Sequence, residues 1–182
     1  MQTIRNIRSD IAFTCRGYSL AKVLWAILFY RSIHCVIAFR VCQGLARIRF
    51  LAPARLLLQA FIATVYGCYL SPKAMIGPGL HLPHAIGIVI GEGVVASGHL
   101  TVYQSVTIGG KMGPAGMSYP TLGEGVTFFP LSAAVGGIYI GSGSQVGAGA
   151  VVCKDHHANS VLAGVPARDL RTSPDGCNDD RS

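Results

Sequence analysis

Residues 122–152 read LGEGVTFFPLSAAVGGIYIGSGSQVGAGAVV, and an apolar residue begins every six-residue step of this stretch. These residues are Leu122, Phe128, Ala134, Ile140, Val146 and Val152. The same spacing joins Ile76 to Leu82, and Ile90 to Ala96, Val102 and Ile108. Glycine or another small residue follows many of them, which suits the tight corners between short, flat strands. This hexapeptide pattern predicts a parallel β-helix, with one apolar side chain pointing inward from each strand.

Two breaks in the spacing predict loops that leave the coil. The first lies between Leu82 and Ile90. The second, between Ile108 and Leu122, contains the long glycine-rich segment GGKMGPAGMSYPT. Loops that leave a rigid repeat scaffold are where functional sites are usually built.

The first third of the chain has a different period. From Ser19 to Val65 apolar residues cluster at helical spacing, and Pro53 can open a new helix after Leu51. We therefore expect three or four helices and an α+β fold. The predicted organisation is a basic helical region at 1–68, a β-helix at 69–170 and a disordered polar tail at 171–182.

Positive charge is concentrated in the helical region. Residues 1–55 hold nine Lys or Arg side chains and one acid, Asp10, whereas the remaining residues hold six basic and seven acidic side chains. Nucleic-acid binding is disfavoured, because the arginines are spread through apolar sequence and do not form a polar cluster. Packing of these helices against partner subunits is the preferred interpretation. Peripheral contact with the inner face of a membrane is the alternative.

No apolar run reaches the roughly 20 residues that a membrane span needs, and no signal-peptide pattern is present. The six cysteines show no C-x-x-C spacing. We therefore expect a cytoplasmic protein whose cysteines are reduced and mostly buried.

His84 is the candidate catalytic residue, because a histidine in a nearly uncharged apolar stretch needs an explanation. A free imidazole has a pKa near 6.5 and can accept a proton at neutral pH. A histidine packed into the wall is the structural alternative. A metal site at His81 and His84 is disfavoured, because residues three apart on an extended strand point to opposite faces and no third ligand is near. No metal is expected.

Three segments resemble the serine O-acetyltransferase family in its short form: GPGLHLPHAIGIVIGEG at 77–93, VYQSVTIGGK at 102–111 and VVCKDHHANSVLAGVPAR at 151–168. The segment FYRSIHCVIAFR at 29–40 is similar to the helix that leads into the family's coil. The resemblance implies a left-handed β-helix, a homotrimer or dimer of trimers with active sites between subunits, and acetyl-CoA as the donor. It also implies a small-molecule acceptor, L-serine, and a place in cysteine biosynthesis.

The resemblance also assigns roles to individual residues. His84 matches the catalytic base, and general base catalysis contributes roughly 10²–10⁴-fold to such a reaction. The donor site would be lined by the residues Gly109, Gly110, Lys111, Ala148 and Lys154, together with the GVPAR corner at 164–168. A plain turn is the alternative for the two adjacent glycines.

The chain departs from the family's pattern at the acceptor side. Tyr69 stands where the family has the aspartate that orients the catalytic histidine, and Pro83 replaces an acid. Ser118 and Tyr119 replace the arginine–histidine pair that holds the amino acid's carboxylate, and they are the candidate acceptor-binding residues. Glu92 is retained and, with Tyr69, is assigned a supporting role.

Three functions follow as hypotheses. The first is a serine O-acetyltransferase. The second is an O-acetyltransferase acting on a sugar or another pathway hydroxyl, which the loss of the carboxylate clamp favours. The third is a non-catalytic trimeric relative.

Overall fold

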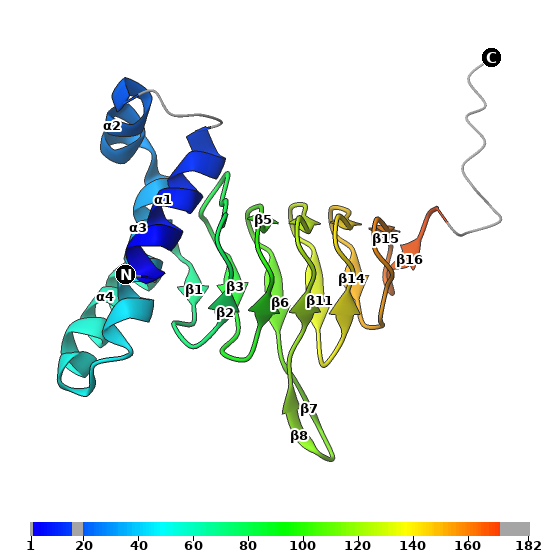
Figure 1. Ribbon diagram of the computed structural model, residues 1–182. Coiled ribbons are helices and arrows are strands. Elements are labelled where there is room, and N and C mark those ends of the chain that lie inside the picture. Colours follow the sequence, from blue (N-terminus) through cyan, green and yellow to red (C-terminus); the bar gives the residue numbers. More distant parts are fainter. Residues whose placement is uncertain (1, 16–19, 172–182) are drawn as a thin grey trace.

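The computed structural model describes residues 2–15 and 20–171. Within these residues the N-terminal region forms four α-helices and one short 3₁₀ helix, which gather at one end of a long row of strands (Figure 1). They are α1 (Gln2–Cys15), α2 (Leu20–Phe29), α3 (Arg31–Leu45), η1 (Arg49–Leu51) and α4 (Ala52–Tyr66). Pro53 lies in the first turn of α4, where its missing N–H costs no hydrogen bond. The prediction of three or four helices in this part of the chain, one of them beginning after Leu51, is confirmed within the described residues.

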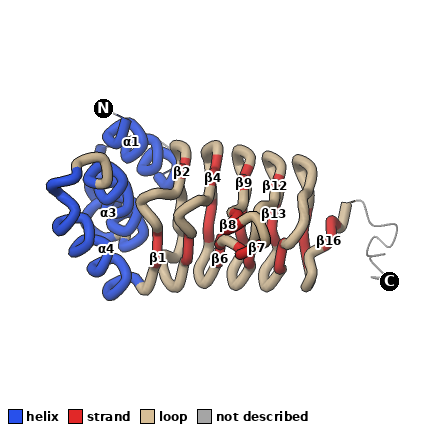
Figure 2. Tube along the Cα trace, turned by 90° about the horizontal axis from the view of Figure 1, so that it is seen from below, coloured by secondary structure: helices blue, strands red, loops and turns tan. Residues whose placement is uncertain are grey.

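The strands form three parallel sheets that the chain visits in rotation, so that they build a three-sided solenoid (Figure 2). Sheet A contains β1 (Tyr69–Leu70), β3 (Val89–Ile90), β6 (Thr107–Gly109), β11 (Ala133–Val135) and β14 (Val151–Val152). Sheet B contains β2 (Met75–Ile76), β4 (Val95–Ala96), β9 (Thr121–Leu122) and β12 (Tyr139–Ile140). Sheet C contains β5 (Thr101–Val102), β10 (Thr127–Phe128), β13 (Gln145–Val146), β15 (Val161–Ala163) and the antiparallel β16 (Arg168–Asp169).

The core of the solenoid is a stack of the side chains that the six-residue spacing placed inside. The register pairs Ile90 with Ile108, and Val102 with Phe128, so that like positions lie above one another. All twelve predicted inward residues are at most 5% exposed. The hexapeptide prediction of parallel strands with one inward residue each is therefore confirmed.

The two predicted loops leave the solenoid at different corners. Residues 83–88 form the corner that connects sheet C to sheet A in the first coil. The glycine-rich segment forms an antiparallel hairpin, β7 (Lys111–Gly113) and β8 (Gly116–Ser118), at a corner from sheet A to sheet B. We call all turns that lead from sheet C to sheet A the C-to-A corners, and all turns that lead from sheet A to sheet B the A-to-B corners. Corners of one kind form a column along the solenoid. The hairpin projects well away from the solenoid in Figure 1.

A buried ion pair joins the helices to the first coil. The Arg40 guanidinium lies 2.8 Å from an Asp10 carboxylate oxygen, and both side chains are 1% exposed. Arg40 also donates to the carbonyl oxygens of Ile76 and Gly77, each at 2.7 Å. Asp10 accepts the backbone N–H groups of Gly79 and Leu80, each at 2.8 Å.

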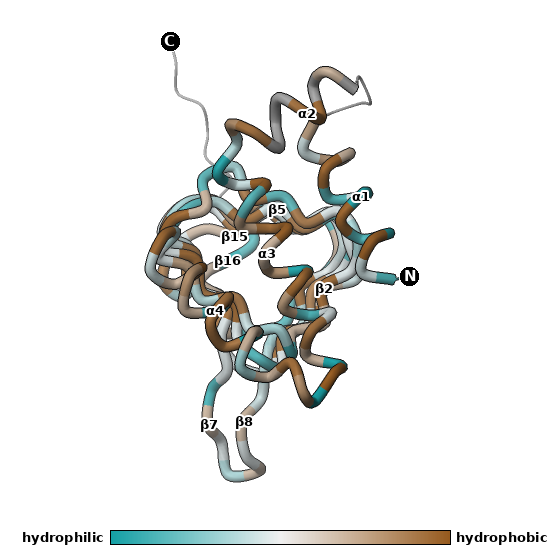
Figure 3. Tube along the Cα trace, turned by 90° about the vertical axis from the view of Figure 1, so that its left-hand side faces the viewer, coloured by the Kyte–Doolittle hydropathy of each residue, from teal (hydrophilic) through white to brown (hydrophobic). Residues whose placement is uncertain are grey.

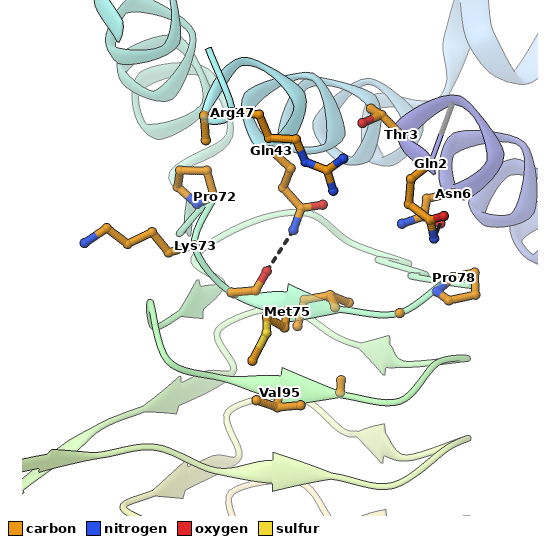
Figure 4. Close-up of a pocket in the computed structure, with 15 residues that line it drawn as sticks. Gln2, Thr3, Asn6, Gln43, Arg47, Pro72, Lys73, Met75, Pro78 and Val95 are labelled. Atoms are coloured by element: carbon orange, nitrogen blue, oxygen red, sulfur yellow. Dashed lines mark hydrogen bonds between the residues drawn. The ribbon is translucent and has the colours of Figure 1, made fainter. Parts of the chain in front are cut away.

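These groups belong to the open edge of the solenoid, because β2 is the last strand of sheet B on the helical side. An unpaired buried backbone group costs free energy, and an open strand edge can pair with another chain. Gln43 adds a hydrogen bond of 2.8 Å from its side-chain N–H to the carbonyl of Ala74 (Figure 4). Side chains of α1 and α3 thus take the place of a further strand.

The five cysteines of the described chain are free. Cys35, Cys42 and Cys68 are buried, Cys15 is half-buried and Cys153 is exposed. The predicted tail lies outside the described residues, apart from residue 171.

Replacing Asp10 by Ala is expected to lower the free energy of unfolding by about 3–5 kcal/mol, because it leaves the Arg40 guanidinium buried without its carboxylate. The measurement is urea denaturation followed by circular dichroism. Lys73→Met is the matched control: it breaks an ion pair with Glu92 whose side chains are 68% and 52% exposed, and it should leave the midpoint nearly unchanged. Equal midpoints for Asp10→Ala and the unsubstituted protein would contradict the assignment.

Candidate functional site

His84 lies on the outside of the first C-to-A corner, beside the start of α3. The two segments are tied together by Ser32, whose hydroxyl donates to the carbonyl of Pro83 at 3.1 Å. They enclose an open cavity of about 330 Å³ lined by residues 29–32 and 83–86. The exposed imidazole therefore faces a space in which a small molecule can bind.

Aromatic rings continue from His84 along the same column of corners. The His84 and Tyr103 ring centroids are 6.3 Å apart, with the rings inclined at 55°. Tyr103 in turn stacks on Phe129 in the next coil, at 5.5 Å and 12°. We call His84, Tyr103 and Phe129 the aromatic ladder.

Tyr103 was missed by the sequence analysis, although the coil register could have found it. His81 bridges to Thr101, so residues 83 and 103 lie opposite each other in successive coils. Within residues 2–15 and 20–171, no hydrogen bond to the His84 ring is present, and Tyr103 is the aromatic ring that lies beside it.

The two supporting residues proposed from sequence lie elsewhere. Tyr69 is on the outer side of sheet A, is 58% exposed, and makes no hydrogen bond with His84 in the described chain. Glu92 lies at an A-to-B corner, where its carboxylate accepts a 2.7 Å hydrogen bond from Lys73. That hydrogen bond is the main cause that raises the pKa of the Lys73 ammonium.

His81 does not share a ligand with His84. Its Nδ1 atom lies 3.1 Å from the hydroxyl oxygen of Thr14, and its ring meets Phe13 edge-on at 5.9 Å. Among the residues that the structure describes, no group of three His, Cys, Asp or Glu side chains is placed to hold a metal ion.

Ser118 and Tyr119 attach the hairpin to the solenoid. The Ser118 hydroxyl donates to the carbonyl of Lys111 at 3.3 Å and accepts the N–H of Gly137 at 3.1 Å. The half-buried Tyr119 ring packs over the glycines of the A-to-B corners: a Cβ atom added to Gly91 would lie 2.8 Å from it. Both side chains are therefore engaged by the fold, and the acceptor-binding role stays a prediction.

The two candidate donor-site glycines differ in what the fold demands of them. A Cβ atom on Gly110 would lie 2.8 Å from both the Tyr119 ring and the Met117 sulfur. On Gly109 it would meet only a methyl group of Thr107, at an ordinary 3.7 Å. Packing against Tyr119 and Met117 therefore accounts for the glycine at position 110. It does not account for the glycine at position 109, where a side chain has room.

The remaining candidates divide between the two corner columns. Ala148 is exposed at the same column of C-to-A corners as His84. Lys111 and Lys154 are exposed at A-to-B corners, together with the two glycines. Residues 164–168 form the last turn before β16. Within one chain, His84 and the Lys111 corner therefore lie at opposite ends of the strands of sheet A.

A larger cavity of about 540 Å³ lies where α1 and α3 meet sheet B (Figure 4). It is lined by polar side chains such as Gln2, Asn6 and Gln43. Of the described residues that line it, none is a predicted site residue.

The curated proteins to which this chain is similar include several serine acetyltransferases. The chain is 34% identical to a serine acetyltransferase of Helicobacter pylori over 164 residues, which cover 85% of this chain and 95% of that protein. It is 37% identical to serine acetyltransferase 2 of Arabidopsis thaliana over 91% of this chain and 51% of that protein. No protein-family model matches.

Solved structures of serine acetyltransferases also match this chain. Serine acetyltransferase of Neisseria gonorrhoeae superposes with a TM-score of 0.82 at 28% identity, covering 92% of this chain and 64% of that one. The soybean apoenzyme gives 0.81 at 31% identity, covering 92% and 69%.

The chain belongs to the serine acetyltransferase family. It spans about half to two thirds of the length of several curated serine acetyltransferases, such as 51% of the Arabidopsis protein and 65% of the one from Buchnera aphidicola, and nearly all of the Helicobacter one. The resemblance inferred from sequence is confirmed.

Gly110→Ala is expected to lower the free energy of unfolding by about 1–3 kcal/mol, because the added methyl group overlaps the Tyr119 ring. Gly109→Ala should leave it unchanged or slightly higher, since the methyl group has room and the unfolded chain loses freedom. Thermal unfolding of the two adjacent variants makes the comparison. Equal destabilisation by both substitutions would contradict the packing difference.

Proposed function

We propose that the protein is an acetyl-CoA-dependent O-acetyltransferase with L-serine as its acceptor. The observation that carries this proposal is the 34% identity with a serine acetyltransferase along 95% of that protein's length. Two related structures, from Neisseria gonorrhoeae and soybean, are complexes with serine. The reaction would supply the acetylated serine of cysteine biosynthesis from a cytoplasmic enzyme.

His84 is the proposed general base. Its neutral ring nitrogen takes the proton of the acceptor hydroxyl while that oxygen attacks the thioester carbonyl carbon. The C–S bond then breaks, the proton passes to the departing sulfur, and free thiol and O-acetyl ester are released. The exposed position of His84 in the cavity between residues 29–32 and 83–86 supports this role.

The donor is proposed to lie along the corners. Gly109 allows close approach of a ligand to the backbone, and Lys111 and Lys154 supply positive charge for phosphate groups. Gly110, Ala148 and residues 164–168 complete the proposed donor site. Ser118 and Tyr119 shape the acceptor side through the hairpin, and Tyr69 and Glu92 act from the surrounding scaffold.

A trimer of left-handed β-helices is the proposed assembly. The separation of His84 from the Lys111 corner within one chain supports a site between neighbouring subunits, where the C-to-A corners of one copy face the A-to-B corners of the next. The helical region at 1–68 and the solenoid at 69–170 are the proposed domains. A dimer of trimers, joined through the helical region, is the alternative assembly.

A sugar or another uncharged hydroxyl compound is the second candidate acceptor. Arg31 is the one Lys, Arg, Asp or Glu among the described residues that line the His84 cavity, and its guanidinium donates to the carbonyl of Val65 at 3.1 Å. The described lining contains no Asp or Glu side chain that could bind the ammonium group of an amino-acid acceptor. Phe29 and Tyr30 instead supply aromatic surface on which a sugar ring can pack.

Thiol release from acetyl-CoA with L-serine is expected to fall by at least about 100-fold in His84→Ala, because the base is lost. His157→Ala, which removes an exposed histidine of the last coil, is the matched control and should keep the activity. Release with sugars and not with serine would establish the second candidate. Acetyl-CoA binding without turnover on any acceptor would refute both enzymes and favour a non-catalytic relative.

Tyr103→Leu is expected to lower kcat about tenfold with a smaller effect on KM, because the His84 ring loses the neighbouring aromatic ring that can help to orient it. Tyr103→Phe keeps the ring and should retain most of the activity. Steady-state kinetics of the two variants test this, with thermal unfolding to confirm equal stability. If the phenylalanine variant loses as much as the leucine variant, the hydroxyl and not the ring contact is what matters.

A further inference from the structure

The outer side of α4 is apolar although it is exposed. Its inner side, with Leu58, Ile62 and Tyr66, packs towards the core. The opposite side and the preceding η1 turn carry a row of exposed apolar residues: Ile48, Phe50, Leu51, Leu56, Leu57, Phe61 and Val65. We call this row the apolar cap face. Phe50 is 93% and Leu57 is 74% exposed.

The apolar cap face lies at the helical end of the molecule, away from the last coil (Figure 1). Figure 3 looks onto this end and shows hydrophobic residues along α4. Arg55 and Gln59 are half-buried on the inner side of α4, and the exposed Thr64 is the one polar residue of α4 on its outer side. A contiguous exposed apolar patch of this kind is unusual on a free protein surface, so the apolar cap face indicates a docking surface.

The positive charge around the apolar cap face favours an anionic partner. No acidic residue occurs between residues 11 and 91, and the one acid before them, Asp10, is 1% exposed and paired with Arg40. Among the described residues up to 91, the helical end therefore carries no accessible carboxylate, and the next acid, the 52% exposed Glu92, is paired with Lys73. Arg47 and Arg49 are exposed, two residues before η1 and within it. Such a surface attracts an anionic partner.

A second copy of the same face is a poor match, because it would bring arginines against arginines without any carboxylate to pair them. An anionic lipid surface matches both properties: its acyl region accepts Phe50 and Leu57, and its headgroups attract the arginines. We propose that the apolar cap face docks the protein on an anionic phospholipid bilayer.

The attachment is peripheral. None of the described helices is long and apolar enough to cross a membrane. α4 has 15 residues and would lie along the interface with its outer side in the headgroup region. This orientation leaves the solenoid, with the His84 cavity, accessible from the surrounding solution.

The test is cosedimentation of the full chain with vesicles of 70% phosphatidylcholine and 30% phosphatidylglycerol, and with vesicles of phosphatidylcholine alone. We expect binding to the first, at most weak binding to the second, and weaker binding as salt is raised. Phe50→Ser/Leu57→Ser should reduce partitioning at least about tenfold, because two exposed apolar side chains are lost. Arg47→Gln/Arg49→Gln should reduce it by about fivefold for each charge.

Matched controls come from the far end of the molecule. Leu170→Ser removes a 50% exposed leucine and Arg171→Gln removes an exposed arginine, and both should bind like the unsubstituted protein. No binding to the anionic vesicles would overturn the proposal, as would equal binding by the Phe50/Leu57 variant. If that variant instead changes the molar mass in solution while the unsubstituted protein binds no vesicles, the face joins copies of this chain. Acetyl transfer is measured in a separate assay, because its outcome does not bear on whether the apolar cap face binds vesicles.

Discussion

The Asp10–Arg40 ion pair is the constraint on which the arrangement of the molecule depends. A solenoid of parallel strands ends in a row of unpaired backbone groups, and these groups must be bonded if the end is buried. Arg40 and Asp10 satisfy four of them with two side chains, while neutralising each other. The ion pair therefore fixes how α1 and α3 lie on the first coil. It thereby sets the position of residues 29–32 beside His84.

The solenoid could be predicted from sequence because its signal is local and repeated. Each inward residue, such as Ile90 or Val146, obeys the same rule as the one six positions earlier, and two breaks in the spacing mark the extruded segments. The junction with the helices could not be predicted in this way. Asp10 and Arg40 are 30 residues apart, and nothing in their neighbourhoods distinguishes them from surface charges.

The residues of the candidate site also differ in whether they could be predicted from the sequence. His84 is conspicuous in sequence because it is polar where its surroundings are apolar. Tyr103 is not, since its contact with His84 arises only when one coil is laid on the next. Ser118 and Tyr119 are predicted to contact the acceptor from their match to the family, and in the fold they also anchor the hairpin. A side chain that replaces a family's binding residue can thus acquire a packing role that the alignment does not reveal.

The far end of the solenoid is closed by a turn of the backbone and by the Asp169 carboxylate, which accepts the N–H of Val161 at 3.1 Å. β16 turns back antiparallel on β15, and the N–H of Ala167 bonds to the carbonyl of Val151 in the last strand of sheet A. β16 thereby occupies the edge of sheet C to which the strands of a second molecule could otherwise add. Since the same residues, 164–168, are candidates for the donor site, a substitution there would change solubility together with affinity. Selection on either property would then act on both.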